Sequence, residues 1–539
     1  MDLTGEGIVK EMKSRESERM PMDSYFQTLH NYFYVEGANI TTKKSKGSEI
    51  NELLDSTSLV SGNILAAGLC NYLTPESTKW LFLRHPNKAL QDDKAVQQWM
   101  NDTTDEVLLT LSRSNFYNQM PTFYKASSVY GTAGLVFEED ERDKIRFYNI
   151  PVPNLYLTED ARERPNAFWL KYEYTAEQAI DRFGSKCSDM IKEVYKSGAN
   201  SDKKFEFLCY IGERQERDPE KMDALNMAVR MVWVEKQTQN IVYESGFKKM
   251  PCVAHRFYKL PFQVYGRSPA MEALPHVRLA NIIQETIMRA SMKQADPALA
   301  IPDDAFIGHP NFNPRQINYY QRGHLSPKDE IIPVGNFGAL NIGLNELQNQ
   351  REQINKIMYV DTFQAFTDLT KQMTVPEVME RTNEKLTLLG PAVGRFMNDV
   401  LQPLIEKVVV MLFEQGALPP LPDAMRADAS FDVRFVGRLV QAQRQTEINN
   451  IVSALGIAGQ VAQVKPEALD MLNADKIVKE VFDIQNVNPE LLNSDMEVRA
   501  LREARAEAQQ QMENLQTAGA VAETYKAAAE GDRNAKMAE

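Results

Sequence analysis

The chain has 539 residues, which at roughly 150 residues per domain predicts three or four structural units. Its 61 Lys and Arg residues against 74 Asp and Glu residues give a net charge of −13, which excludes a generally basic nucleic-acid binder and leaves room only for local DNA contacts. Cys70, Cys187, Cys209 and Cys252 lie far apart, which argues against a disulfide framework or a cysteine zinc site and favours reduced thiols in a cytosolic compartment. The charged first 20 residues and the lack of a long apolar run indicate neither a secretion signal nor a membrane span.

Known catalytic signatures are absent from the sequence. The six histidines form no His-Glu-x-x-His motif, and there is no P-loop and no Gly-x-Ser-x-Gly elbow. The glycines of residues 335–343 have the spacing of turns rather than of a dinucleotide loop, and the acidic residues 138–141 are typical of a solvated hairpin tip. The sequence therefore predicts no enzyme, no cofactor and no metal site.

The first 260 residues mix helical and strand patterns and predict a large α+β domain. Apolar residues near the 3.6-residue period indicate helices, and alternating runs indicate strands. The predicted elements are helices at 51–73 and 95–112, a β-hairpin at 134–137 and 145–148, a strand at 168–174, and an antiparallel pair at 227–235 and 239–244.

The middle of the chain predicts a long helical hairpin. Residues 275–295 carry one apolar stripe and predict a helix of 21 residues, roughly 31 Å long. Ser268 and Pro269 are typical of the start of a short preceding helix, after which Pro275 kinks or restarts the chain. Residues 344–366 predict a second helix of 23 residues, roughly 34 Å long. These patterns alone do not distinguish a hairpin with a function of its own from an ordinary helical hairpin buried in a core.

The segment between the two helices has six prolines in residues 297–333, so it is not a continuous helix. It predicts a compact group of turns and short strands, such as 324–325 and 330–332. After the second helix, the polar residues 367–373 break the helical pattern. Residues 374–377 then fit a capping box that starts another helix.

The C-terminal part is predicted to be mostly helical. A helix kinked by Pro403 precedes a rigid proline-rich linker at 418–422, and residues 437–490 continue the helical pattern. Residues 493–539 are rich in Ala, Glu, Gln and Arg and have no large apolar face. That composition favours disorder past about residue 520, or a helix that packs only against copies of itself.

Five groups of short sequence blocks follow one another along most of the chain. They are LAAGL at 65–69 with LTP at 73–75 and WLFL at 80–83; YGTA at 130–133 with FYNIP at 147–151; VYGRSP at 264–269 with Ala273 and Leu274; MTVPEV at 373–378 with Glu380, Arg381, LGP at 389–391 and LQPLI at 401–405; and RFVG at 434–437 with QAQR at 441–444. In this order they resemble the head-to-tail connector, or portal, proteins of short-tailed bacteriophages. The last 50 residues match only in composition.

The resemblance implies a portal-type ring subunit of the α+β class, predominantly helical. It implies an α+β wing, a two-helix stem, a small mixed clip, a channel loop, and a helical crown that leads into a C-terminal barrel. The implied segments are the wing at 1–267 and 376–436, the first stem helix at 268–296, the clip at 297–343, the second stem helix at 344–366, the channel loop at 367–375, the crown at 437–492, and the C-terminal helix at 493–539 with a disordered end.

The resemblance also implies a function. A ring of about twelve copies is expected at one vertex of the capsid in the virion, after assembly in the host cytoplasm. Double-stranded DNA is expected to pass through it, during packaging and again during ejection, without sequence-specific binding. The implied protein partners are the terminase large subunit, the tail adaptor, and the major capsid and scaffolding proteins. The lack of a P-loop is consistent with this function, because the ATPase of the packaging motor would be another protein. The acidic net charge is also consistent with it, because a channel that binds phosphates weakly lets DNA slide.

Two sets of residues are candidate sites. Lys371, Gln372 and Met373 are expected to approach DNA in the channel, with a buried linker under the wing as the alternative. Polar residues of the clip are expected to dock the motor and the adaptor, although some of them would make only contacts between subunits. These clip residues are His309, Asn311, Asn313, Arg315, Arg322 and Lys328.

A rival interpretation is a nucleic-acid-processing enzyme with an unrecognised site. The two interpretations differ in what they predict for the purified protein. A conduit forms a large ring without nucleotide or metal, whereas an enzyme is a small species with one convergent pocket.

Overall fold

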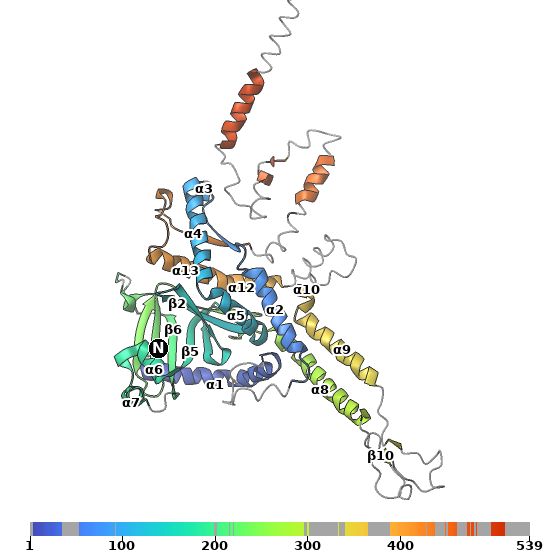
Figure 1. Ribbon diagram of the computed structural model, residues 1–539. Coiled ribbons are helices and arrows are strands. Elements are labelled where there is room, and N and C mark those ends of the chain that lie inside the picture. Colours follow the sequence, from blue (N-terminus) through green and yellow to red (C-terminus); the bar gives the residue numbers. More distant parts are fainter. Residues whose placement is uncertain are drawn as a thin grey trace, which may run out of the picture. The chain divides into compact units, whose positions relative to one another are not determined.

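The computed structural model describes residues 4–34, 53–91, 93–198, 202–214, 216–218, 220–221, 223–295, 299–300, 332–333, 340–364, 389–426, 428–436, 448, 451–460, 472–474, 476–478, 481 and 497–511 (Figure 1). The chain divides into two units. The first comprises Met1–Phe82, Asp102–Pro419 and Val433–Gln443, and the second comprises Leu83–Asn101, Pro420–Asp432 and Arg444–Glu539. Helices and antiparallel sheets together place the described chain in the mixed α+β class.

A five-stranded antiparallel sheet with helices over both faces lies in the first unit. Its strands, in spatial order, are β4 (Leu155–Glu159), β5 (Pro165–Thr175), β6 (Lys204–Glu213), β7 (Val229–Glu235) and β8 (Ile241–Phe247). Helices α6 (Ala176–Phe183) and α7 (Asp189–Ser197) pack on one face, and α1 (Gly5–Leu29) packs on the other. Side chains alternate along β6, so that Phe207 and Cys209 face α6 and α7 while Leu208 and Tyr210 face α1. Burial of both faces explains why β6 is apolar along most of its length.

A second sheet has three antiparallel strands in the order β3-β2-β9. They are β2 (Thr132–Asp140), β3 (Lys144–Ile150) and β9 (Cys252–Arg256). The hairpin predicted at 134–148 is confirmed by the β2–β3 pairing. At its tip the Asp140 carboxylate accepts hydrogen bonds from the backbone N–H groups of Arg142 (2.8 Å) and Asp143 (2.9 Å), which close the turn and lower the pKa of Asp140. The strands predicted at 168–174, 227–235 and 239–244 correspond to β5, β7 and β8.

The predicted N-terminal helices are confirmed, with shifted ends. The short helices α6 and α7 were not predicted, and neither were two helices of 15 or more residues. Helix α2 (Thr57–Leu73) lies within the predicted span 51–73, and α4 (Lys94–Arg113) covers 95–112. The two longer unpredicted helices are α1 and α5 (Phe116–Tyr130). The buried residues of α1 are widely spaced, and α5 contains Pro121. Helix α5 ends at Gly131, where φ is +74° and an added Cβ would lie 2.4 Å from the carbonyl oxygen of Gly266.

Trp80 links the start of strand β1 (Leu81–Arg84) to the strand β12 (Asp432–Phe435) that pairs with it. The indole of Trp80 is fully buried and stacks on Phe116 and on Phe435, with ring centroids 6.2 Å and 6.3 Å apart. The backbone N–H of Val436 donates to the carbonyl oxygen of Trp80 over 2.8 Å. Two segments 350 residues apart in sequence therefore share one aromatic cluster.

Three consecutive helical segments follow residue 389. They are α12 (Gly390–Phe396), the π-helical turn η6 (Met397–Leu401) and α13 (Gln402–Glu414). The irregularity that was predicted at Pro403 falls one turn earlier, because Pro403 occupies the first turn of α13, where its missing N–H costs no hydrogen bond. Buried apolar side chains of α13, such as Leu404 and Val408, anchor this segment in the core.

The remaining described elements are short. They are η1 (His30–Tyr34), α3 (Lys88–Gln91), η3 (Val152–Asn154), η4 (Gly184–Lys186), η5 (Ala224–Asn226), η7 (Asp423–Met425), and the two-residue strands β10 (Leu299–Ala300) and β11 (Ile332–Pro333), which pair with each other. Residues 451–460 and 497–511 are helical, in keeping with the helical prediction for these regions. The predicted strand 324–325 and the helix expected from the capping box at 374–377 lie outside the described residues.

Candidate functional site: an exposed helical hairpin and its anchored root

Helix α8 (Pro269–Ala295) contains the helix predicted at 275–295 and is continuous through Pro275, so of the two alternatives, a kink or a restart, the restart is wrong. Ser268 caps it: the Oγ accepts a hydrogen bond from the N–H of Met271 (3.1 Å) and donates to the carbonyl oxygen of Val129 (2.7 Å). Pro275 removes the N–H that would normally reach the carbonyl oxygen of Met271. The hydroxyl of Tyr25 on α1 donates to that oxygen over 3.4 Å, which helps the helix to continue through the proline.

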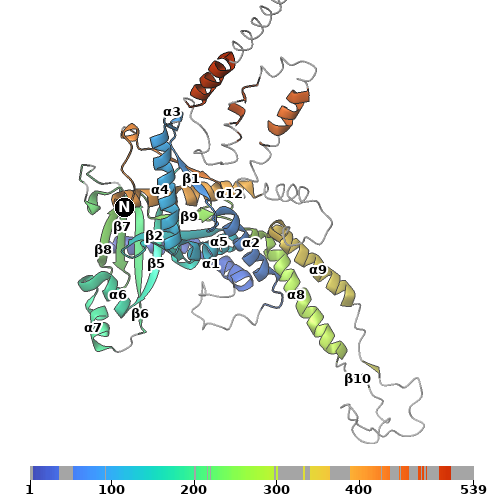
Figure 2. The same cartoon turned by 45° about the horizontal axis from the view of Figure 1, so that its top comes forward.

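Helix α9 (Leu340–Ile357) is the second helix of the hairpin, and it is followed by the short α10 (Val360–Gln364). The single helix predicted at 344–366 is therefore divided. The division falls at Tyr359, whose φ of +56° is left-handed and ends α9. The hydroxyl groups of Tyr359 and Tyr258 lie 2.8 Å apart in a hydrogen bond that holds this junction. Helices α8 and α9 lie side by side in both views (Figures 1 and 2).

The hairpin root, defined as residues 269–281 of α8 and 347–357 of α9, is anchored by polar contacts to residues 54–61. The Oδ1 of Asn281 accepts hydrogen bonds from the backbone N–H groups of Leu54 (2.9 Å) and Asp55 (3.1 Å). Arg351 of α9 pairs with the buried carboxylate of Asp55 over 2.8 Å. Burial alone would raise the pKa of Asp55, but hydrogen bonds from Thr57 and the Arg351 ion pair outweigh it and lower that pKa.

The distal half of the hairpin, defined as residues 282–295 of α8 and 340–346 of α9, differs sharply from the root. Its side chains with described burial include none that is buried, although several are large and apolar. The two helices still approach closely, because an added Cβ on Gly343 would lie 3.3 Å from Cγ1 of Ile287. The exposed apolar side chains are Ile282 (60% exposed), Met288 (39%), Met292 (64%), Ile342 (73%) and Leu344 (49%). Such an apolar surface is typical of a protein interface.

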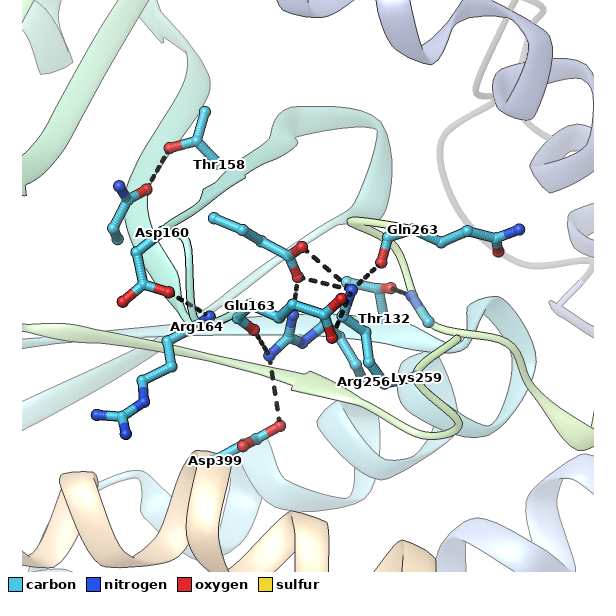
Figure 3. A network of polar contacts seen from close by, with 12 residues as sticks. Thr132, Thr158, Asp160, Glu163, Arg164, Arg256, Lys259, Gln263 and Asp399 are labelled. Atoms are coloured by element: carbon cyan, nitrogen blue, oxygen red, sulfur yellow. Dashed lines mark hydrogen bonds and ion pairs between the residues drawn. The ribbon is translucent and has the colours of Figure 1, made fainter. Parts of the chain in front are cut away.

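A buried polar network joins the two sheets to η6 (Figure 3). Arg256 of β9, whose side chain is 5% exposed, pairs with Glu159 of β4, donates to the carbonyl oxygen of Glu163 (3.2 Å) and lies 3.8 Å from the carboxylate of Asp399. Lys259 also pairs with Glu159, over 3.1 Å. Burial raises the pKa of Asp399 despite the nearby Arg256. Five charged groups thus hold the loop after β9 against the β4–β5 turn.

The sequence comparisons decide the family. The pattern of the family described as bacteriophage head to tail connecting protein matches residues 6–492. The chain belongs to this family. It is 30% identical over 512 residues, 92% of the chain, to 90% of the "Probable portal protein" of Bordetella phage BPP-1. It is also 26% identical over 534 residues, 97% of the chain, to 95% of the "Portal protein" of Salmonella phage epsilon15.

The connector is a structural phage protein and not an enzyme, so the rival interpretation is set aside. The described residues include no group of three or more His, Cys, Asp or Glu side chains able to hold a metal ion. Among those same residues no helix combines the length and apolarity needed to cross a bilayer. All four cysteines are free, and burial raises their thiol pKa values.

The candidate site residues from the sequence lie outside the described part of the connector. This holds for the channel-loop residues Lys371, Gln372 and Met373 and for all the clip residues, namely His309, Asn311, Asn313, Arg315, Arg322 and Lys328. Their roles remain predictions.

Sequence patterns did not reveal the residues that anchor the hairpin root or those of the Arg256 network. Asn281 was a usable signal, because a carboxamide on the apolar stripe of a predicted helix needs a buried partner. Arg256 and Lys259 gave no such signal, since their acidic partners lie about 100 residues earlier in the chain.

Proposed function

We propose that copies of this connector form a closed ring at one capsid vertex, through which double-stranded DNA enters during packaging and leaves during ejection. The observation that carries the proposal is the apolar distal half of the hairpin. Five large apolar side chains there are 39–73% exposed, and no described part of the chain covers them. A ring gives every copy two neighbours through heterologous contacts, so neighbouring hairpins cover each other's apolar side chains.

The segment assignments form part of this proposal. Residues 1–267 and 376–436 are the wing, 268–296 and 344–366 are the stem, 297–343 the clip, 367–375 the channel loop, 437–492 the crown, and 493–539 the C-terminal helix. The adjacent α8 and α9 support the stem, because they are anchored at one end and uncovered at the other. The two sheets with their covering helices support the wing.

The acidic composition supports passage of DNA rather than retention. Each phosphate that a protein neutralises adds affinity, and a net charge of −13 per copy opposes strong non-specific binding. Lys371, Gln372 and Met373 of the channel loop would offer each copy's weak and sequence-independent contact with the DNA backbone.

The clip is proposed to dock the terminase large subunit during packaging and the tail adaptor afterwards, while the wing meets the capsid and scaffolding proteins. Charge reversal at Arg315 and Arg322 is expected to weaken adaptor binding and leave rings intact. Measurement of adaptor binding to purified variant rings tests this, and an unchanged affinity would exclude these two residues from docking.

Mass photometry and negative-stain microscopy of the purified full chain test the ring itself. Twelve copies of 61.3 kDa amount to about 736 kDa. We expect ring-shaped particles near this mass without added nucleotide or metal. Only monomers and dimers across a range of salt and protein concentrations would contradict the proposal.

A further inference from the structure

The loop after β9 presents a nearly fully exposed phenylalanine. Phe262 is 96% exposed and its φ is +61°, a left-handed conformation that bulky side chains rarely adopt. Leu260 precedes it and is 38% exposed, so residues 260–262 (Leu-Pro-Phe) form an apolar tip, here called the Phe262 tip. A strained backbone that exposes an aromatic ring persists only where the surrounding structure holds it.

The Arg256 network supplies that support. The backbone N–H of Phe262 donates to the Glu163 carboxylate over 3.2 Å. The Nζ of Lys259 donates to the carbonyl oxygen of Gln263, and it also pairs with Glu159. The loop is thus held on both sides of Phe262, which lowers the conformational entropy that a partner would otherwise have to remove on binding.

A cavity near the opposite edge of the same sheet is suited to an aromatic ring. It measures about 470 Å³, and its walls combine Trp233 of β7 and Tyr243, Ser245 and Phe247 of β8 with six charged side chains, namely Glu138, Glu139, Arg182, Lys248, Lys407 and Glu414. A cavity of roughly 150 Å³ already admits benzene. It is called the β8 pocket here.

The sheet places the tip and the pocket at opposite edges. The tip is bonded to Glu159 and Glu163 at the end of β4, and the pocket lies beside β7 and β8. In the order β4-β5-β6-β7-β8, four strand spacings separate the outer strands, roughly 19 Å. Complementary features at opposite edges of one subunit are the requirement for a heterologous contact that repeats around a ring.

We infer that the Phe262 tip of one copy inserts into the β8 pocket of the next copy in the ring. This inference rests on the proposed ring and adds a second contact between subunits, separate from the hairpin. Phe262 serves as the aromatic anchor, and the partly exposed side chains of Met227, Tyr243 and Phe247 contact its ring. Central aromatic anchors carry much of the energy of an interface.

A pair of cysteines tests the contact directly in the full chain. We expect the double variant Phe262→Cys with Ser245→Cys, treated with a short bis-maleimide, to give a ladder of cross-linked species that ends at the ring mass. Each single variant provides the control for reaction at the native cysteines. Rings that form normally but show no more cross-linking than the single variants would overturn the inference and leave the proposed ring intact.

Two further variants cover the case in which the cysteine pair does not assemble. Phe262→Ala and Ser245→Trp, which fills the pocket, are each expected to raise the concentration needed for ring assembly by roughly 10-fold or more, as expected for loss of one buried aromatic contact. Tyr195→Ala, on α7 and 52% exposed, is the matched control and is expected to change nothing. Unchanged assembly of both test variants would overturn the inference, whereas failure of the unaltered chain to form rings would overturn the proposed function instead.

Discussion

The root and the distal half of the α8–α9 hairpin belong to the same two helices but have opposite environments. In the root, the polar side chain of Asn281 is buried and hydrogen-bonded, and Arg351 pairs with the buried carboxylate of Asp55 in the 54–61 segment. In the distal half, Ile282 and Ile342 are 60% and 73% exposed. The root is stabilised within one copy, whereas the distal half leaves its apolar side chains for another copy to cover. Within the hairpin, the distal half is therefore the part proposed to contact other copies.

The largest expected effect comes from charge in the distal half. The double variant Ile282→Asp with Ile342→Asp is expected to abolish rings, because two carboxylates per copy would be buried without partners at each interface. The free energy of unfolding of the monomer should change by less than about 1 kcal/mol, at about 0.5 kcal/mol for each substitution, since both side chains are exposed. Mass photometry and urea unfolding measure the two quantities. The control is Tyr195→Asp, outside the hairpin, which should still form rings. Rings formed by the double variant would show that the distal half of the hairpin does not contact other copies.

The second prediction concerns the buried ion pairs that hold the first unit together. Arg256→Met is expected to lower the free energy of unfolding by about 3 kcal/mol, because it removes a charged group that is 5% exposed, takes that group away from the carboxylate of Asp399 and leaves Glu159 with Lys259 alone. The matched control is Lys79→Met, which removes an ion pair with Asp105 whose side chains are both more than half exposed, and which should cost less than about 1 kcal/mol. Urea unfolding monitored by tryptophan fluorescence compares them. Equal losses would show that burial does not set the strength of these pairs.

The third prediction concerns the buried His255 and the dependence of the free energy of unfolding on pH. Burial lowers the pKa of His255 from 6.5 to about 3, so between these values the unfolded chain binds a proton that the folded chain does not. The free energy of unfolding should therefore fall as the pH falls below about 6.5, with His255 contributing about 1.4 kcal/mol per pH unit. His255→Gln should show a correspondingly smaller slope in urea unfolding between about pH 7 and about pH 5. Equal slopes for the two proteins would exclude His255 as the source.

The smallest expected effect on assembly comes from the channel loop. Lys371→Ala is expected to leave ring formation and stability unchanged, because a channel residue contributes to neither the root nor the subunit contacts. It is expected to alter DNA packaging or retention, through loss of one weak phosphate contact per copy. Packaging assays with variant rings measure the effect. A variant that fails to form rings would show that Lys371 has a structural role.

Local patterns in the sequence were sufficient for many elements. The β2–β3 hairpin was predictable because two apolar runs flank an acidic turn, and α4 because its apolar residues keep the helical period. Helix α1 was missed because its buried residues are sparse and include Arg19, which is 2% exposed. The guanidinium of Arg19 donates to the carbonyl oxygens of Val152, Pro153 and Leu155 over 2.6–2.8 Å, and no pattern within α1 reveals partners 130 residues away.

The predicted boundaries of helices α8 and α9 were wrong for a similar reason. Pro275 ordinarily ends a helix, but Ser268 caps α8 earlier and Tyr25 of α1 donates to the carbonyl oxygen that the proline leaves free. The end of α9 at Tyr359 depends on a hydrogen bond to Tyr258, in a different part of the chain. The family was recognisable from ordered sequence blocks, but the exposed Phe262 was not, because exposure depends on the network that holds its loop.

The hydrogen bond between Tyr258 and Tyr359 also links the two parts of the chain that we propose to contact other copies. Tyr359 is the joint between α9 and α10, and Tyr258 pairs through its backbone with Arg267 at the base of the loop that carries Phe262. One pair of hydrogen-bonded phenols therefore joins the loop that carries Phe262 to the end of α9. Thermodynamic linkage is reciprocal. If binding of the Phe262 tip favours contact between hairpins, contact between hairpins favours binding of the tip by the same free energy. The ring is expected to close cooperatively, with its two contacts acting as one coupled element.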